Sequence, residues 1–120
     1  VTVGEHRLLL PGDIETVRER ELVRYWRHGL RSDWLLVGHH GSRTSSSETL
    51  LKHVRPATAV ISSGYANRFR HPHPEVLRRL QKDGLQLLAT ADSGALSFRF
   101  SPGEVPTAAS WRQKLRRYWM

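Results

Sequence analysis

The sequence predicts an α/β layered fold, and two observations support that prediction. Short apolar runs that end in glycine- or proline-containing turns alternate with segments in which apolar residues recur at helical spacing. The expected order of elements is β-α-β-α-β-α-β-β, an alternation that is typical of a sheet covered by helices. With 120 residues, of which 38% are hydrophobic, the chain is long enough for one modest core.

The first half of the chain contains two expected strands and one expected helix. The run HRLLL at 6–10 predicts a strand that ends in a Pro-Gly turn. Apolar residues recur at helical spacing between residues 15 and 28 and predict an amphipathic helix, for which Gly29 is a plausible stop. The run DWLLVG at 33–38 predicts a second buried strand.

A helix and a third strand are expected next. The segment SSSETLLKHV at 45–54 predicts a helix capped by serine, in which Glu48 forms a capping box with a preceding serine. The serines at 45–47 fit this capping function better than the function of a nucleophile, because no Asp-His partner pattern accompanies them. The run ATAVISSG at 57–64 predicts the third strand.

The last elements are a proline-containing loop, a helix and a hairpin. Residues 65–73 predict a loop, and Pro74 suits the first turn of a helix that runs to about Asp83. The runs LQLLAT and ALSFRF flank ADSG and predict an antiparallel hairpin at an edge of the sheet. Three residues of its second strand are expected on one face: Leu96, Phe98 and Phe100.

Composition excludes some function classes. The chain has no cysteine, so disulfides, thiolate metal sites and a cysteine nucleophile are excluded. No apolar run approaches the eighteen or more residues of a membrane helix, and the N-terminal segment lacks the pattern of a signal peptide. The formal net charge of +8, carried mainly by arginine, favours a polyanionic partner, although a solvated basic surface gives the same balance.

Chemically useful residues follow the expected strands. Asp13, His39, His40 and the loop that contains His71 all come after strand ends, where functional loops gather in open α/β sheets. Carboxylate and imidazole are ligands that zinc or manganese accepts when thiolates are absent. Ser42 could donate a hydrogen bond to a phosphate oxygen or orient an imidazole.

Each of these residues also has a plainer interpretation. Asp13 could be a helix cap, and paired histidines on a loop are often solvated or hydrogen-bonded. The H-x-H spacing of His71 and His73 would suit a chelate on a strand, but the flanking prolines disfavour a regular strand. The other histidines are expected at the surface: His6, His28 and His53.

Four segments in this order carry a family resemblance. They are LLLPGDIE at 8–15, SDWLLVGHHGSRTSS at 32–46, SSGYANRFRHPHPEVLRRL at 62–80 and TADSGAL at 90–96. Together they resemble the C-terminal half of the metallo-β-lactamase-fold domain of ComEC competence proteins. The resemblance implies half of an αβ/βα sandwich over residues 1–102, followed by a basic, aromatic tail over 103–120.

The resemblance also implies a two-metal hydrolase that uses zinc or manganese and acts on DNA during natural transformation. In that fold the residue at Asp13 bridges both metals, and a histidine after the next strand binds one of them. His39 is favoured for this ligand because it directly follows the strand, and His40 remains an alternative. The residues that match the family's substrate-side positions, or lie near these loops, are Ser42, Arg43, Asn67, Arg68, Arg70, His71 and His73.

The fold's first metal motif, a cluster of the type H/D-x-D-x-D-H, is missing from these 120 residues. A catalytic metal needs three protein ligands and an open position for water, so the chain alone is expected to be inactive. We expect it to be part of a larger inner-membrane protein, on its extracytoplasmic face, whose N-terminal half-domain and membrane channel would be its partners. The uncovered faces of a half-domain would also favour self-association.

Two functions from different classes therefore remain. The preferred one is part of a metal-dependent DNA phosphodiesterase, and the alternative is a non-catalytic, basic DNA-binding module of the same fold. Hydrolysis of a small phosphoester is a weaker third, because the positive charge suits a polymer better. The tail TAASWRQKLRRYWM at 107–120 is expected to form a basic amphipathic helix that packs on the domain, contacts a membrane surface or contacts nucleic acid.

Overall fold

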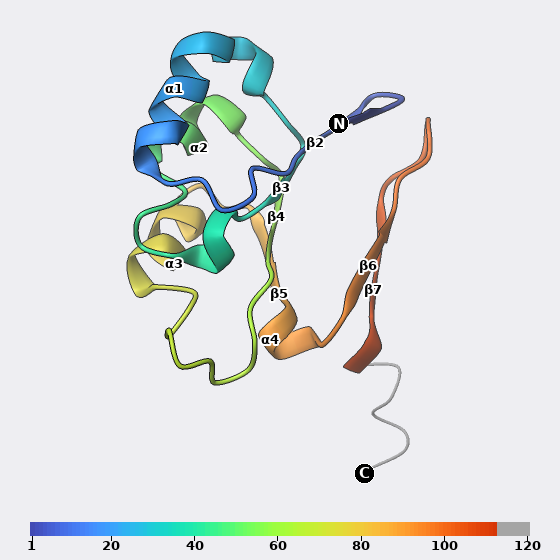
Figure 1. The fold of residues 1–120 in the computed structure, drawn as a ribbon. Helices are drawn as coiled ribbons and strands as arrows, with labels where there is room; N and C mark the ends of the chain where they lie inside the picture. Colours follow the sequence, from blue (N-terminus) through green and yellow to red (C-terminus); the bar gives the residue numbers. More distant parts are fainter. Residues whose placement is uncertain (113–120) are drawn as a thin grey trace.

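The computed structural model describes residues 1–112, which form a five-stranded sheet, its helices and a separate two-stranded ribbon (Figure 1). In the large sheet the strands pair in chain order, and all neighbours are parallel except the first pair. The five strands are β1 (Thr2–Val3), β2 (His6–Leu9), β3 (Trp34–Leu36), β4 (Thr58–Ile61) and β5 (Gln86–Ala89). The α/β class expected from the alternating pattern is confirmed.

The helices connect successive parallel strands, and the three longest lie on the same side of the sheet in Figure 1. These three are α1 (Thr16–Trp26), α2 (Glu48–Val54) and α3 (Pro74–Gln81). The shorter helical elements are η1 (Arg27–Leu30), η2 (Gly38–Gly41) and α4 (Thr90–Ser93). Among residues 1–112, no helix is both long enough and apolar enough to cross a membrane.

The core lies between the sheet and these helices. Side chains of the central strands β3 and β4 pack against apolar residues of α2 and α3, as parallel strands buried under helices require. The buried residues of this cluster are Leu35, Val37, Leu51, Ala59, Ile61, Val76 and Leu80. A second buried cluster, formed by Leu30, Leu50 and Val54, packs against Leu22 and Val23 of α1. These two clusters explain the alternation of apolar runs and helical periods in the sequence.

The expected hairpin between the fourth and fifth predicted strands is wrong. β5 pairs in parallel with β4, the chain then turns through α4, and β6 (Leu96–Arg99) pairs with β7 (Thr107–Ser110) in a second, antiparallel sheet. Figure 1 shows this ribbon on the side of the large sheet that faces away from the helices. The reason is apolar contact across the layers, because Phe98 and Phe100 pack edge-on against Trp34, with ring centroids 5.2 and 6.1 Å away.

The expected face of β6 is confirmed, but the expected helix over 107–120 and the expected division at residue 102 are not. Leu96, Phe98 and Phe100 are half-buried while the residues between them are exposed. The expected helix over 107–120 is wrong at its start, because Thr107–Ser110 form β7. Its remainder from residue 113 lies outside the described residues. The division of the chain at residue 102 stays a prediction.

The helix ends differ in part from the sequence expectation. α1 ends at Trp26 rather than at Gly29, and Pro74 is the first residue of α3 as expected. Ser47 caps α2 by accepting a hydrogen bond from the Leu50 amide. The expected capping box is wrong, because Glu48 follows the cap directly and extends to Lys82 Nζ, 3.3 Å away.

Candidate functional site

The parallel strands place three loops at one edge of the sheet. The loop that contains Gly12 follows β2, η2 follows β3, and the segment 62–73 follows β4. Two backbone hydrogen bonds connect them: the His39 amide donates to Gly12 O (3.0 Å) and the His73 amide donates to Gly41 O (2.8 Å). The expectation that strand-end loops gather at one place is confirmed for these three loops.

His39 and His40 both have a left-handed backbone, with φ of 48° and 54°. Successive non-glycine residues rarely adopt this conformation, because each costs about 1–2 kcal/mol relative to the right-handed region. Neighbouring contacts hold the turn, since the Ser42 amide donates to His39 O (2.9 Å) in addition to the contact with Gly12. Because of this turn, the imidazoles of His39 and His40 contact different residues.

The His40 ring is anchored by one nitrogen. Nδ1 lies 2.6 Å from the Ser62 carbonyl oxygen, and because a carbonyl only accepts, Nδ1 donates its hydrogen. In the neutral imidazole, Nε2 is then the nitrogen with a free lone pair. This is the arrangement that metal-ligating histidines commonly show, with the second nitrogen oriented by a backbone carbonyl.

His39 faces a chain of polar groups instead. Its Nδ1 lies 3.5 Å from Glu15 Oε1, and the same oxygen accepts a hydrogen bond from Thr44 Oγ1 (3.0 Å). Ser42 Oγ lies 3.2 Å from Thr44 Oγ1. The Ser42 hydroxyl thus reaches the His39 imidazole through Thr44 and Glu15, and Glu15 is a site residue that sequence reasoning missed.

His71 lies against the first histidine. Its ring centroid is 6.1 Å from that of His39. The Phe69 ring stacks on the His71 ring, with a centroid distance of 5.9 Å. Burial lowers the pKa of His71 below its usual value of 6.5, and the nearby His39, His40 and His73 lower it further. The buried Nδ1 has no hydrogen-bond partner among the described residues. His71 is therefore held as a neutral imidazole at pH 7.

Asn67 positions His71. Its Oδ1 accepts from the His71 amide (2.9 Å), and its Nδ2 donates to the His71 carbonyl (2.6 Å) and to Gly64 O (3.0 Å). Both polar atoms of the side chain are used inside the loop. A cavity of about 200 Å³ lies here, lined by His40, Ser63, Gly64, Asn67, Phe69 and His71.

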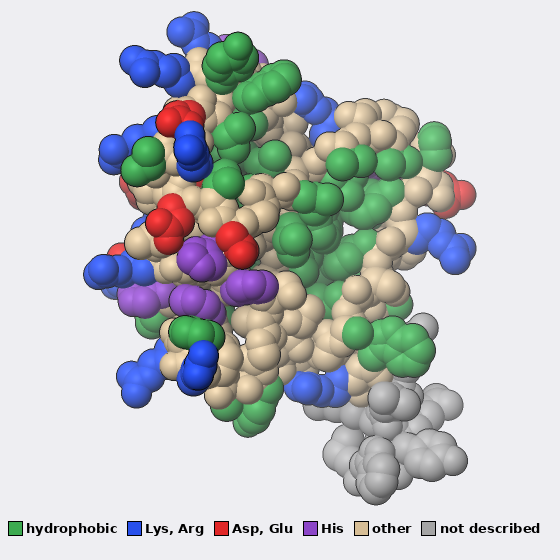
Figure 2. All heavy atoms as spheres, viewed as in Figure 1, with side chains coloured by type: hydrophobic (Ala, Val, Ile, Leu, Met, Phe, Trp, Pro, Cys, Tyr) green, Lys and Arg blue, Asp and Glu red, His purple; other side chains and the backbone are tan. Residues whose placement is uncertain are grey.

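The arginines of the expected site are exposed, and its last histidine caps a helix. Arg43, Arg68 and Arg70 are exposed, and the Arg68 guanidinium lies 4.7 Å from the centre of the Phe69 ring. His73 is the N-cap of α3, where its Nδ1 accepts from the Glu75 amide at 3.2 Å. Figure 2 shows histidine side chains grouped on one face, with acidic side chains beside them and cationic side chains around.

Asp13 is exposed in the turn before α1. The interpretation of Asp13 as a helix cap is wrong, because the N-cap residue of α1 is Glu15. Within residues 1–112, no group of three His, Asp or Glu side chains is arranged to hold a metal ion. Since a catalytic metal needs about three protein ligands, these residues alone do not fit a complete metal centre.

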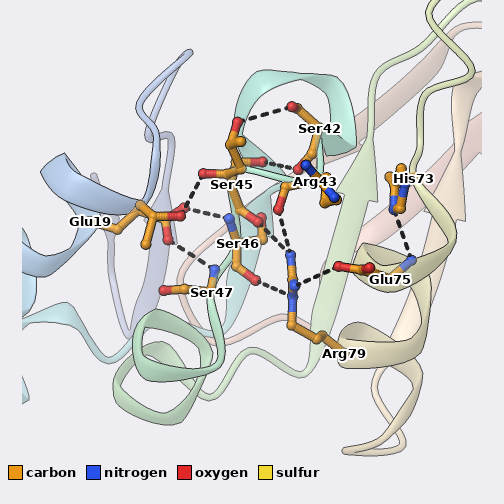
Figure 3. A network of polar contacts seen from close by, with 11 residues as sticks. Glu19, Ser42, Arg43, Ser45, Ser46, Ser47, His73, Glu75 and Arg79 are labelled. Atoms are coloured by element: carbon orange, nitrogen blue, oxygen red, sulfur yellow. Dashed lines mark hydrogen bonds and ion pairs between the residues drawn. The ribbon is translucent and has the colours of Figure 1, made fainter.

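Sequence reasoning also missed a polar network that holds residues 43–47, the segment between η2 and α2 (Figure 3). The buried carboxylate of Glu19, on α1, accepts hydrogen bonds from the amides of Ser46 and Ser47. Arg79, on α3, donates to three carbonyls of the same loop, those of residues 43, 45 and 46, at 2.9–3.2 Å. The spacing of Glu19 with Leu22 and Val23 on the buried face of α1 is the signal that could have revealed it.

One expected surface histidine is not at the surface. His6 is only 12% exposed in its side chain, and its Nε2 lies 2.8 Å from Glu104 O and 3.2 Å from Ser101 O. It therefore connects β2 to the turn that joins β6 and β7. The surface prediction holds for His28, which is exposed, whereas the half-buried His53 donates from Nδ1 to the Thr49 carbonyl (2.8 Å).

Comparison with known proteins finds sequence similarity over most of the chain, including to a competence protein. It is 44% identical over 118 residues, 98% of the chain, to competence protein ComA of Neisseria gonorrhoeae. It is 38% identical over 77% of the chain to ComE operon protein 3 of Bacillus subtilis, and 42% identical over 81% to recombination protein 2 of Haemophilus influenzae. The chain spans 16%, 12% and 12% of the length of these relatives. No model of a protein family matches the sequence.

Proposed function

We propose that this chain is a segment of a ComEC-family competence protein and forms part of a site that acts on DNA during natural transformation. Its similarity to a protein named as a competence protein, over 98% of the chain, supports this assignment. The net charge of +8 suits a polyanionic substrate. In this proposal the segment belongs to an inner-membrane protein and lies on its extracytoplasmic side, next to a DNA channel.

The activity that we propose for the complete site is metal-dependent hydrolysis of DNA phosphodiesters, with zinc or manganese as cofactor. The observation that carries this proposal is the imidazole of His40, whose Nδ1 is used by Ser62 O so that Nε2 is free to act as a ligand. This chain would contribute Asp13 and His39 or His40. The other ligands would come from a preceding half-domain, and for that reason we assign no catalytic step to this chain alone.

Contacts to DNA would come from the segment 62–73. Tyr65 and Phe69 are 80% and 64% exposed, and exposed aromatic rings stack on unpaired bases. Arg68 and Arg70 lie exposed in the same segment, and Arg43 is exposed on the loop before α2; each could contact a backbone phosphate through a pair of N–H groups. Stacking aromatics interleaved with arginine favour a single strand over a closed duplex.

The second candidate is a basic module that binds DNA without cleaving it. The observation in its favour is that no three potential ligands are grouped within residues 1–112, while the cationic and aromatic side chains are in place. The two functions differ in one requirement, because only the hydrolase needs a metal.

The test compares two purified proteins: the 120-residue chain, and a longer protein that includes one further half-domain before Val1. For each, bound zinc and manganese are measured by mass spectrometry, and cleavage of a labelled DNA strand is followed on gels. Asp13→Asn is the site variant. Asp83→Asn, at an exposed position near the end of α3, is the matched control.

The hydrolase is supported if only the longer protein holds metal and cuts DNA, and if Asp13→Asn but not Asp83→Asn abolishes both. DNA binding without metal or cleavage in both proteins would support the binding module instead. Cleavage of bis(p-nitrophenyl) phosphate without cleavage of DNA would indicate a small phosphoester as substrate. Failure of both proteins to bind or cut DNA would reject both candidates.

A further inference from the structure

A second basic cavity lies at the opposite end of the parallel strands. It has a volume of about 350 Å³, and its lining residues all carry cationic or titratable nitrogen: His28, Arg31, Lys52, His53 and Arg55. They come from η1 and from the end of α2, the segments that lead into β3 and β4. The histidine loop, which we define as residues 38–47 between β3 and α2, follows the carboxyl end of β3, so the two sites lie at opposite ends of that strand.

Helix capping explains only part of this cluster. Basic residues often gather where a helix ends because they satisfy its last carbonyls. Here those carbonyls already have partners: the Arg55 amide donates to Leu51 O (2.9 Å), Arg55 Nε to Lys52 O (3.2 Å) and the Ser32 amide to Val54 O (3.0 Å). These contacts leave the terminal nitrogens of the Arg55 guanidinium and the Lys52 ammonium available to bind an anion.

The cations of the cavity also lack an acidic counterpart in its lining. None of the five lining residues is Asp or Glu, and no ion pair within residues 1–112 joins any of the five to a carboxylate. The nearby Glu48 carboxylate attracts Lys52 through space but pairs directly with Lys82 instead. Two of the side chains are fixed by the protein itself, since His53 Nδ1 donates to Thr49 O and Arg55 Nε to Lys52 O. Convergent, partly preorganised cations around a small cavity are suited to a phosphate group.

We infer that this cavity, lined by His28, Arg31, Lys52, His53 and Arg55, binds a backbone phosphate of a DNA strand that also reaches the histidine loop. The inference rests on the proposed function in DNA uptake. The chain from Ser32 to His39 is seven residues long, and at about 3.3 Å per residue it spans about 23 Å. The stacked nucleotides of a duplex advance about 3.4 Å each, so roughly seven nucleotides are an upper limit for this distance, and an extended single strand needs fewer.

The test measures binding of a fluorescein-labelled 20-nucleotide oligothymidine by anisotropy at several salt concentrations. The cavity variant is Arg31→Gln with Lys52→Gln. The control, Arg78→Gln with Arg99→Gln, removes the same two positive charges at exposed positions of α3 and β6. Circular dichroism confirms that both variants are folded. The slope of log K against log salt is negative. We expect its magnitude to fall by about 0.7 for each lost phosphate contact, in the cavity variant only.

A thymidine dinucleotide adds a second readout, because it is too short to reach both sites. The cavity variant should lose more affinity for the long strand than for the short one. If the wild-type chain binds the long strand but both variants have the same salt slope, the inference is wrong and the proposed function stands. If the wild-type chain binds no DNA, both fail. Loss of binding to phosphatidylglycerol vesicles, with DNA binding like that of the control, would assign the cavity to lipid and overturn the inference.

Discussion

The carboxylate of Glu19 provides the sharpest test of how the histidine loop is held. The side chain is 1% exposed and accepts hydrogen bonds from the backbone amides of Ser46 and Ser47. Ser46 has a left-handed backbone with φ of 53°, and Ser47 is the N-cap of α2. Glu19 therefore accepts hydrogen bonds from two backbone amides at the end of the histidine loop, where the chain turns into α2.

Glu19→Gln keeps the shape of the side chain but replaces one acceptor oxygen by an NH₂ group, which cannot accept from an amide. One hydrogen bond to a charged group is lost, and such bonds contribute about 1.5–3 kcal/mol to the free energy of unfolding. At about 4 °C per kcal/mol for a chain of this size, the expected decrease in Tm is roughly 6–12 °C.

Urea denaturation followed by circular dichroism measures the effect, with a lower midpoint and an unchanged m value as the expected result. Glu21→Gln is the control, because Glu21 lies two residues away on the same helix and makes an exposed pair with Arg18 at 2.7 Å. Water screens that pair, so little change is expected. Equal midpoints for the two variants would refute the assignment of Glu19 as the buried acceptor of the loop.

Three further outcomes are expected. Gly41→Ala should destabilise the protein by about 1–3 kcal/mol, because overpacking adds to the strain of a positive φ: the new Cβ would lie 2.6 Å from Pro72 Cβ. Gly84→Ala, also at positive φ but with open space, is the control in urea denaturation, and an equal loss in both would exclude the clash. Ser47→Ala should cost about 1 kcal/mol through loss of the α2 cap, whereas Ser47→Asn should restore most of it; a wild-type midpoint for Ser47→Ala would contradict this. The imidazole of His71 should titrate below pH 6.5 in NMR spectra. Because its folded pKa is lowered, its contribution to stability is present above pH 6.5 and is lost as the pH falls from 6.5 to the folded pKa, and a midpoint at or above 6.5 would contradict the buried environment.

The sequence predicts the parallel part of the fold well, because each strand there is a short apolar run between turn signals. It predicts the position of His39 and His40 for the same reason, since a chain that leaves a parallel strand must place its next residues at the carboxyl edge. The left-handed backbone of both histidines could not be predicted, because no local preference favours it. Contacts with the loops after β2 and β4, together with the bond from the Ser42 amide to His39 O, hold that turn.

The failed hairpin has a different cause. The segment ADSG has the residues of a tight turn, and local turn chemistry favours pairing of the strands beside it. The structure instead uses this segment for α4, so that β5 completes the parallel sheet and β6 crosses to its other face. Contact between the rings of Trp34 and Phe98 stabilises this arrangement. These residues lie far apart in the sequence, so local patterns cannot predict their contact.

The same limit explains why Glu19 and Arg79 were missed although they hold the loop. They lie on α1 and α3 and act on one loop between them, Glu19 accepting from its amides and Arg79 donating to its carbonyls. Each side chain alone resembles an ordinary charged residue of an amphipathic helix. Because Glu19 and Arg79 satisfy the backbone of residues 43–47, no imidazole is needed to hold that segment. The His40 imidazole uses only its Nδ1, for the Ser62 carbonyl, and this supports the proposal that Nε2 serves as a ligand in a site that acts on DNA.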